Sequence, residues 1–299
     1  LFQQAYTIVD SAIVGRYVGE TALAAVGASY ALTSIFICIA IGGGIGASVI
    51  ISHHFGAHNY GRMKTGIRTT LLSFLFISLI LGGIGLIFSQ QIMEVLNTPA
   101  DAIDIAVTYL NIYFLGLPFL FMYNILSSMF NALGESRIPL YLLIFSSVLN
   151  IFLDLYFVLV LHMGIKGAAV ATVIAQYVSG VGILLYFLVR YPEYHISRKD
   201  MKWNRENLKQ IMSLSGFTCL QQSVMNFGIL VVQGIVNSFG ATVMAAFAVA
   251  VKIDTIAYMP VGDFGNAFSV FVAQNYGAGK IDRIHKGLRQ GIAVGVGYG

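Results

Sequence analysis

Carboxyl groups inside apolar segments are the residues of this chain best placed to do chemistry. Asp10, Asp154, Asp254 and Asp263 each lie within a long hydrophobic stretch, whereas most other acids lie at the ends of such stretches or between them. An ionised carboxylate at the centre of a bilayer is costly unless water, a cation or a polar partner reaches it. Taking up a proton is the other way to remove that cost. Either route makes such a residue a candidate carrier of an ion.

The sharpest cluster combines an amide, a carboxylate and a hydroxyl. Asn150 and Asp154 are four residues apart and therefore share one face of a helix. Thr172 follows on the next expected helix, after a short turn at 162–166. Such hard oxygen ligands suit Na⁺ or an exchangeable proton. The spacing alone fits equally well with interhelical hydrogen bonds that only hold the bundle together.

A second polar set lies further along the chain and is a candidate for substrate binding. Gln222, Asn226, Gln233 and Asn237 follow one another at intervals of 4, 7 and 4, which places them on one helix face. That face is expected to line an aqueous cavity, although hydrogen bonding between helices explains it equally well. Asp254, in the following apolar segment, is a candidate for attracting a cationic substrate.

The composition places the chain in a membrane. Apolar residues make up 57% of its 299 positions and charged residues only 10%, with a mean hydropathy of +0.79. A soluble domain carries about 25% charged residues. We therefore predict an all-α, polytopic membrane helix bundle. The expected helices lie near 1–17, 25–53, 67–89, 105–132, 138–161, 167–190, 209–237 and 243–274, with a ninth starting near 287. Because Leu1 and Gly299 lie inside apolar segments, we expect a fragment that lacks its start and its last helices.

A repeat with a constant offset organises the bundle. The stretch from Val18 to Thr70 recurs 221 positions later, so that Gly19 matches Gly240 and Gly56 matches Gly277. Secondary transporters are often built from such duplicated units, with the substrate site between them. The offset spans six helices, so the copies have the same orientation. We predict an N-lobe over 1–190 with helices one to six, a cytoplasmic connection over 191–207, and a C-lobe over 208–299 with helices seven, eight and the start of nine.

Basic residues predict how the bundle sits. Of the 17 Lys and Arg, 14 lie in alternate connections, among them Arg62, Lys64, Arg68, Arg283, Lys286 and Arg289. Positive connections stay in the cytoplasm, so we expect a multi-pass protein of the plasma membrane with its basic loops inside the cell. Anionic membrane lipids account for the formal charge of +4 without any nucleic acid partner. We expect a monomer.

Several motifs resemble one known transporter family. VDSAIVGRYVGETALAAVG, NALGESRIPL, NIFLDLYFVLV, GIKGAAVATVIAQ and AQNYGAGK are similar to segments of the multidrug and toxic compound extrusion (MATE) transporters. The resemblance implies twelve helices in two six-helix lobes and export of small organic cations in exchange for Na⁺ or H⁺. It also implies that Asp10, Asn150, Asp154 and Thr172 form the cation site of the N-lobe, which Na⁺ or a proton would occupy. Where some members carry a Glu on the seventh helix, this chain has Gln221 and Gln222.

Three function classes follow, with a cation-coupled antiporter working by alternating access as the first. A lipid-linked precursor flippase of the same superfamily is the alternative, but it should place more cations in the cavity than Lys252 alone. An intramembrane enzyme is disfavoured because no catalytic motif occurs, and no cofactor other than the coupling ion is expected. Cys38 and Cys219 have no partner spacing and are expected to pack without a disulfide or a metal.

Overall fold

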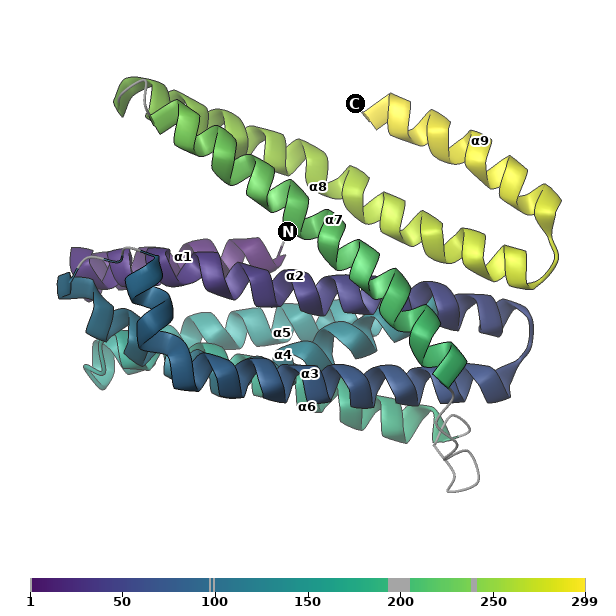
Figure 1. The fold of residues 1–299 in the computed structure, drawn as a ribbon, viewed down its shortest axis with the longest axis horizontal. Coiled ribbons are helices and arrows are strands. Elements are labelled where there is room, and N and C mark those ends of the chain that lie inside the picture. The colour runs from purple at the N-terminus through teal and green to yellow at the C-terminus, as the bar shows by residue number, and fades with distance from the viewer. Residues whose placement is uncertain (1, 97, 99, 193–204, 238–240, 299) are drawn as a thin grey trace.

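The computed structural model describes residues 2–96, 98, 100–192, 205–237 and 241–298 (Figure 1). Some side chains within the helices, most of them in the first, seventh and eighth, lie outside this description. Over these residues the chain is an all-helical bundle. Its helices are α1 (Phe2–Tyr17), α2 (Glu20–Gly56), α3 (Tyr60–Val95), α4 (Ala100–Ala132), α5 (Arg137–Leu155) with a π-helical turn η1 (Tyr156–Val160), α6 (Ile165–Arg190), α7 (Arg205–Asn237), α8 (Ala241–Gly277) and α9 (Ile281–Tyr298).

The predicted all-α bundle and the order of its helices are confirmed, but several predicted boundaries were too short. Arg62, Lys64 and Arg68 were expected in a connection and instead lie in the first turns of α3. The helix starts early because the Asn59 side chain accepts a hydrogen bond from the Arg62 backbone N–H at 3.2 Å. Likewise α9 begins at Ile281 rather than near 287, which makes its basic residues helical. Polar turns thus extend the helices beyond their apolar lengths.

Five of the described helices are long and apolar enough to cross a membrane, judged by length and composition. They cover Glu20–Gly56, Tyr60–Val95, Ala102–Ala132, Arg137–Val160 and Ile165–Arg190. Large apolar side chains face outward on them, as at Phe76 and Ile87 of α3, which are 65% and 71% exposed. Such a surface is stable only against lipid.

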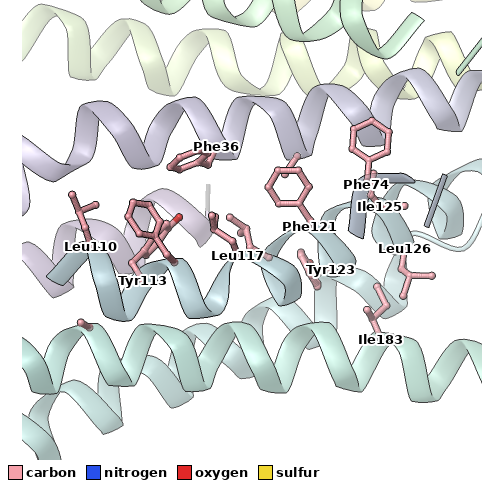
Figure 2. Packing of buried hydrophobic residues seen from close by; sticks show 14 of the residues in the cluster. Phe36, Phe74, Leu110, Tyr113, Leu117, Phe121, Tyr123, Ile125, Leu126 and Ile183 are labelled. Carbon is pink, nitrogen blue, oxygen red and sulfur yellow. The ribbon is translucent and has the colours of Figure 1, made fainter. Parts of the chain in front are cut away.

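α4 is the central helix of the first lobe and packs against α2, α3 and α6. Phe114, Phe121 and Phe130 of this helix are among the largest fully buried side chains. Figure 2 shows Phe121 in the buried cluster, together with Leu110 and Leu117 of the same helix. Phe36 of α2 meets Phe114 edge to face, with ring centroids 5.7 Å apart. Gly85 of α3 lies directly against the Phe114 ring, so a small residue allows these helices to approach closely.

The second lobe meets the first mainly through α2, which contacts both α7 and α8. In Figure 1 these helices come together at the end that carries the α2–α3 and α8–α9 turns, and they separate toward the opposite end. We call the end of the bundle that carries the α2–α3 and α8–α9 turns the basic end. α7 begins at Arg205, inside the predicted 191–207 connection, of which 193–204 lie outside the described residues.

Candidate functional site

Two buried carboxyl groups meet between α1 and α5. Asp10 is 5% exposed and Asp154 is fully buried. The two carboxyl groups are close enough to share a hydrogen bond once one of them is protonated. As carboxylates neither can donate, and Oδ1 of Asp10 and both carboxyl oxygens of Asp154 then have no hydrogen-bond partner. Burying two like charges together is unfavourable, so this pair requires a bound cation or a proton.

The backbone changes its winding directly after Asp154. α5 ends at Leu155 and passes into η1, where the Leu161 N–H donates to the Tyr156 carbonyl at 3.1 Å, five residues back. Such π turns are rare and frequently occur at functional sites. Here the turn ends the regular part of α5 one residue beyond the buried acid.

Asn150 and Thr172 line a small cavity next to this pair. Asn150 is 1% exposed, and neither its amide oxygen nor its amide nitrogen has a hydrogen-bond partner. The Thr172 hydroxyl donates to the Ala168 carbonyl at 3.1 Å, which leaves its oxygen able to accept a hydrogen bond or to bind a cation. The cavity has a volume of about 30 Å³ and lies between α4, α5 and α6. A cavity of this size has room for a water molecule.

Sequence analysis missed part of this polar site. The cavity is also lined by Ser146, Ser147 and Ser179, which were not predicted, and by Gln176, which the sequence places one turn beyond Thr172. The buried Gln176 side-chain oxygen, like both polar atoms of Asn150, has no partner. The signal was present in the sequence, because 146, 150 and 154 repeat at intervals of four on α5, while 172, 176 and 179 lie on one face of α6.

The structure therefore joins the four predicted cation-site residues in two steps. Asp10 meets Asp154 directly, and Asn150, one turn before Asp154, shares the cavity with Thr172. Across the described residues, no three His, Cys, Asp or Glu side chains gather as a metal site. A cation at this place would be held by carboxyl, amide and hydroxyl oxygens instead.

The predicted substrate residues are less completely described. Gln222 is half-buried on α7. The side chains of Asn226, Gln233 and Asp254 lie outside the described residues, so their role stays a prediction.

The two cysteines lie near each other at the contact between α2 and α7. Cys38 is buried on α2, and the Cys219 thiol on α7 donates to the Ile39 carbonyl at 3.6 Å. Both side chains pack at this helix contact, as expected, and the absence of a disulfide stays a prediction.

Glycines bring the two lobes into backbone contact. At the basic end Gly56 of α2 lies against the Gln274 carbonyl of α8, and Gly277 of α8 lies against the His53 carbonyl of α2. The two contacts are related by the repeat, since 277 − 56 = 221 and 274 − 53 = 221. A β-carbon at either glycine would overlap the facing backbone. This reciprocal contact, the glycine crossing, is the closed end of the lobe interface.

Comparison with known proteins decides the family. The MatE family model matches residues 1–156 and 218–299. The chain belongs to the MatE family. MatE relatives include the probable multidrug resistance proteins YoeA and YpnP of Bacillus subtilis (strain 168), with 31% and 30% identity over 98% and 94% of this chain. These alignments cover 65% and 63% of the two relatives, so the chain spans just under two thirds of their length.

Solved MatE-type structures share the fold. A crystal structure of MATE in the straight conformation matches with a TM-score of 0.92 at 23% identity, over 99% of this chain and 66% of that one. A MATE family transporter solved in an outward-facing conformation matches with a TM-score of 0.89 at 23% identity, over 98% of this chain and 65% of that one. The match to the predicted family is thereby confirmed in sequence and in fold, for a multi-pass membrane protein.

Proposed function

We propose that the full-length protein is a cation-coupled antiporter of the plasma membrane that exports small organic cations. The names of its relatives, multidrug resistance proteins, support drug export as the activity. The observation that carries the coupling is the Asp10–Asp154 pair, two buried carboxyl groups without a basic partner among their described hydrogen bonds. An entering Na⁺ or proton would neutralise this pair.

The coupling site in this proposal consists of Asp10, Asn150, Asp154 and Thr172. Asp154 and Asp10 supply the negative charge, while Asn150 and Thr172 supply neutral oxygens beside the small cavity. A proton needs only one of the carboxyl oxygens, whereas Na⁺ needs several oxygen ligands at once. Both ions fit this set of atoms, so the choice between them is left to experiment.

Alternating access is supported by the shape of the lobe interface. The lobes are in backbone contact at the basic end and apart at the other end. With the basic loops in the cytoplasm, this is a state open to the outside. Uptake of the cation in one state and of the drug in the other would shift the population between them, without a covalent step.

Ethidium efflux from vesicles that contain the full-length protein tests the proposal. We expect either a Na⁺ gradient or a proton gradient to drive efflux, and Asp154→Asn to abolish the driven part. Asp104→Asn, which changes an exposed acid at the start of α4, is the matched control and should retain efflux. Full driven efflux by the Asp154→Asn protein would show that coupling lies elsewhere.

A further inference from the structure

A second cavity lies between the lobes at the basic end, far larger than the one beside Asn150. Its volume is about 610 Å³. Its walls are two facing stripes, formed by Val49, Ile50, His53 and His54 of α2 and by Phe268, Ser269, Val272, Ala273 and Tyr276 of α8, with Arg62 of α3 and Gln210 of α7 completing the lining. Pockets of about 300–1,000 Å³ typically accommodate a drug-sized ligand.

The charge of the lining selects an anion. Arg62 carries a fixed positive charge, and two imidazoles, His53 and His54, lie on the neighbouring wall. None of the eleven lining residues carries a carboxylate. Among these described lining residues a cationic drug would meet no carboxylate, whereas a guanidinium is a side-chain group suited to the oxygens of a phosphate.

One polar group in the lining lacks a partner. His54 is 7% exposed, and its Nε2 atom has no hydrogen bond. A buried polar atom normally has a partner, so an orphaned one points to a bound group that supplies it. His53, by contrast, lies against the Tyr276 ring with centroids 5.9 Å apart, where α2 and α8 meet.

The apolar part of the lining selects an amphiphile rather than a free ion. The apolar lining residues are Val49, Ile50, Val272 and Ala273. An inorganic anion would leave this apolar surface uncovered. The cationic residues lie at the end of spanning helices, which is the depth of lipid head groups. Basic pockets between helices on the cytoplasmic side are known to take anionic lipid head groups.

We propose that this cavity binds the phosphate group and part of an acyl chain of an anionic phospholipid. Because its walls come from both lobes beside the glycine crossing, the bound lipid contacts both lobes and stabilises the closed basic end. The leaflet from which the lipid enters follows from the orientation proposed above. Lipid binding itself is measured without any transport, so this inference and the proposed function can fail separately.

Binding of phosphatidylglycerol to the purified full-length protein, compared with phosphatidylcholine, provides the test. We expect the wild-type protein to prefer phosphatidylglycerol and Arg62→Gln to weaken its binding by about tenfold, through loss of a charge-assisted contact. The matched control is Arg283→Gln, which alters the repeat-equivalent residue (62 + 221 = 283) outside the cavity lining. Equal losses from both variants, or none from Arg62→Gln, would overturn the inference.

Two further arms separate the source of the phosphate and the place of binding. Ser269→Trp fills the cavity without changing its charges, and it should weaken phosphatidylglycerol binding as much as Arg62→Gln does. Unchanged lipid binding by this variant would place the lipid on the outer surface and refute the cavity as the site. Inorganic phosphate should compete poorly; if it displaces the lipid at equal concentration, the site is one for a soluble anion and the lipid assignment is wrong.

Discussion

The two copies of the repeat agree where they touch and differ where an ion would bind. Gly56 and Gly277 hold equivalent places and make equivalent contacts across the glycine crossing. Asp10, in contrast, lies just before the matched stretch that begins at Val18, and the same offset of 221 leads from it to Val231. The acid is buried against α5, whereas this valine is 47% exposed on α7. At these positions the two copies share the glycines of the crossing and differ in the acid.

The contact between α2 and α7, beside the glycine crossing, also differs between the copies. Gly42 and Gly46 let α7 approach α2, and a β-carbon at either would overlap Cys219 or Ser215. Their counterparts on α8 are Asp263 and Ala267. The contacts of the glycine crossing are therefore equivalent in the two copies, whereas the close contact between α2 and α7 has no equivalent on α8. A single copy of the sequence could not show which of its glycines serve this contact.

The largest effect is expected when Asp10 is replaced by valine, the residue found 221 positions later. Asp10→Val should reduce cation-driven ethidium efflux to the level of empty vesicles, because one charge of the coupling pair is gone. The thermal unfolding temperature should stay the same or rise, since a buried like-charge contact is removed. A marked fall in unfolding temperature, with efflux falling only as the amount of folded protein falls, would mean that Asp10 is structural.

The symmetric centre of the interface predicts equal damage from either copy. Gly56→Ala and Gly277→Ala should each destabilise the closed basic end by about 1–3 kcal/mol, because the new methyl group overlaps the facing backbone. Spin labels on the exposed residues 58 and 278 should report a wider separation in both variants. Gly83→Ala is the control, since a β-carbon there meets nothing within 4 Å. Damage from only one of the two variants would show that the crossing is not reciprocal.

The α2–α7 contact predicts a smaller loss of stability that differs between the two copies. Gly46→Ala gives α2 the residue that α8 carries at 267, and it should weaken the α2–α7 contact by about 1–2 kcal/mol through overpacking against Ser215. It should also disturb the hydrogen bond from the Ser215 hydroxyl to the Gly43 carbonyl, which measures 3.1 Å. The reverse change, Ala267→Gly, should cost only the helix propensity, about 0.5–1 kcal/mol. Thermal unfolding measures both, and equal losses would contradict the asymmetry.

The smallest effect is expected at a contact that belongs to the first lobe alone. Burial, followed by a hydrogen bond to Glu135, raises the pKa of Tyr191 from 10.0 to about 12. The neutral phenol is thus favoured in the folded protein, so its contribution to stability is present below pH 10 and is lost as the pH rises toward 12. Tyr191→Phe should cost about 0.5–1.5 kcal/mol without changing efflux. Absorbance titration should show a late-ionising phenol that disappears in the variant; an unchanged titration would refute the contact.

Much of the helical layout was predictable because apolar length and charge alternation are local properties of the sequence. Asp10, Asn150 and Asp154 were recognisable for a similar reason, because they are polar residues within apolar segments. The helix ends were less predictable, since capping by Asn59 and polar amphipathic turns carry α3 and α9 past their apolar lengths. Both signals are local in sequence, but they depend on capping and on polar helix turns, which a search for apolar length does not detect.

The large cavity at the basic end was not predictable from one pass along the chain. His53 and His54 have no acid or cysteine nearby in sequence, and sequence analysis gave them no role. Only the pairing of α2 with α8, more than 200 residues apart, places Arg62 and Tyr276 around the same space. A hint existed in the repeat, where Gly56-Ala57 matches Gly277-Ala278 at the contact between the copies.

The glycine crossing also constrains how this protein can evolve. A larger residue at 56 is tolerable only if the backbone near 274 retreats, and the mirrored pair at 277 and 53 obeys the same constraint. Substitutions at these four positions should therefore accumulate together among descendants of the chain. An alignment of related sequences should therefore show correlated substitutions at positions 53, 56, 274 and 277, two in each copy of the repeat.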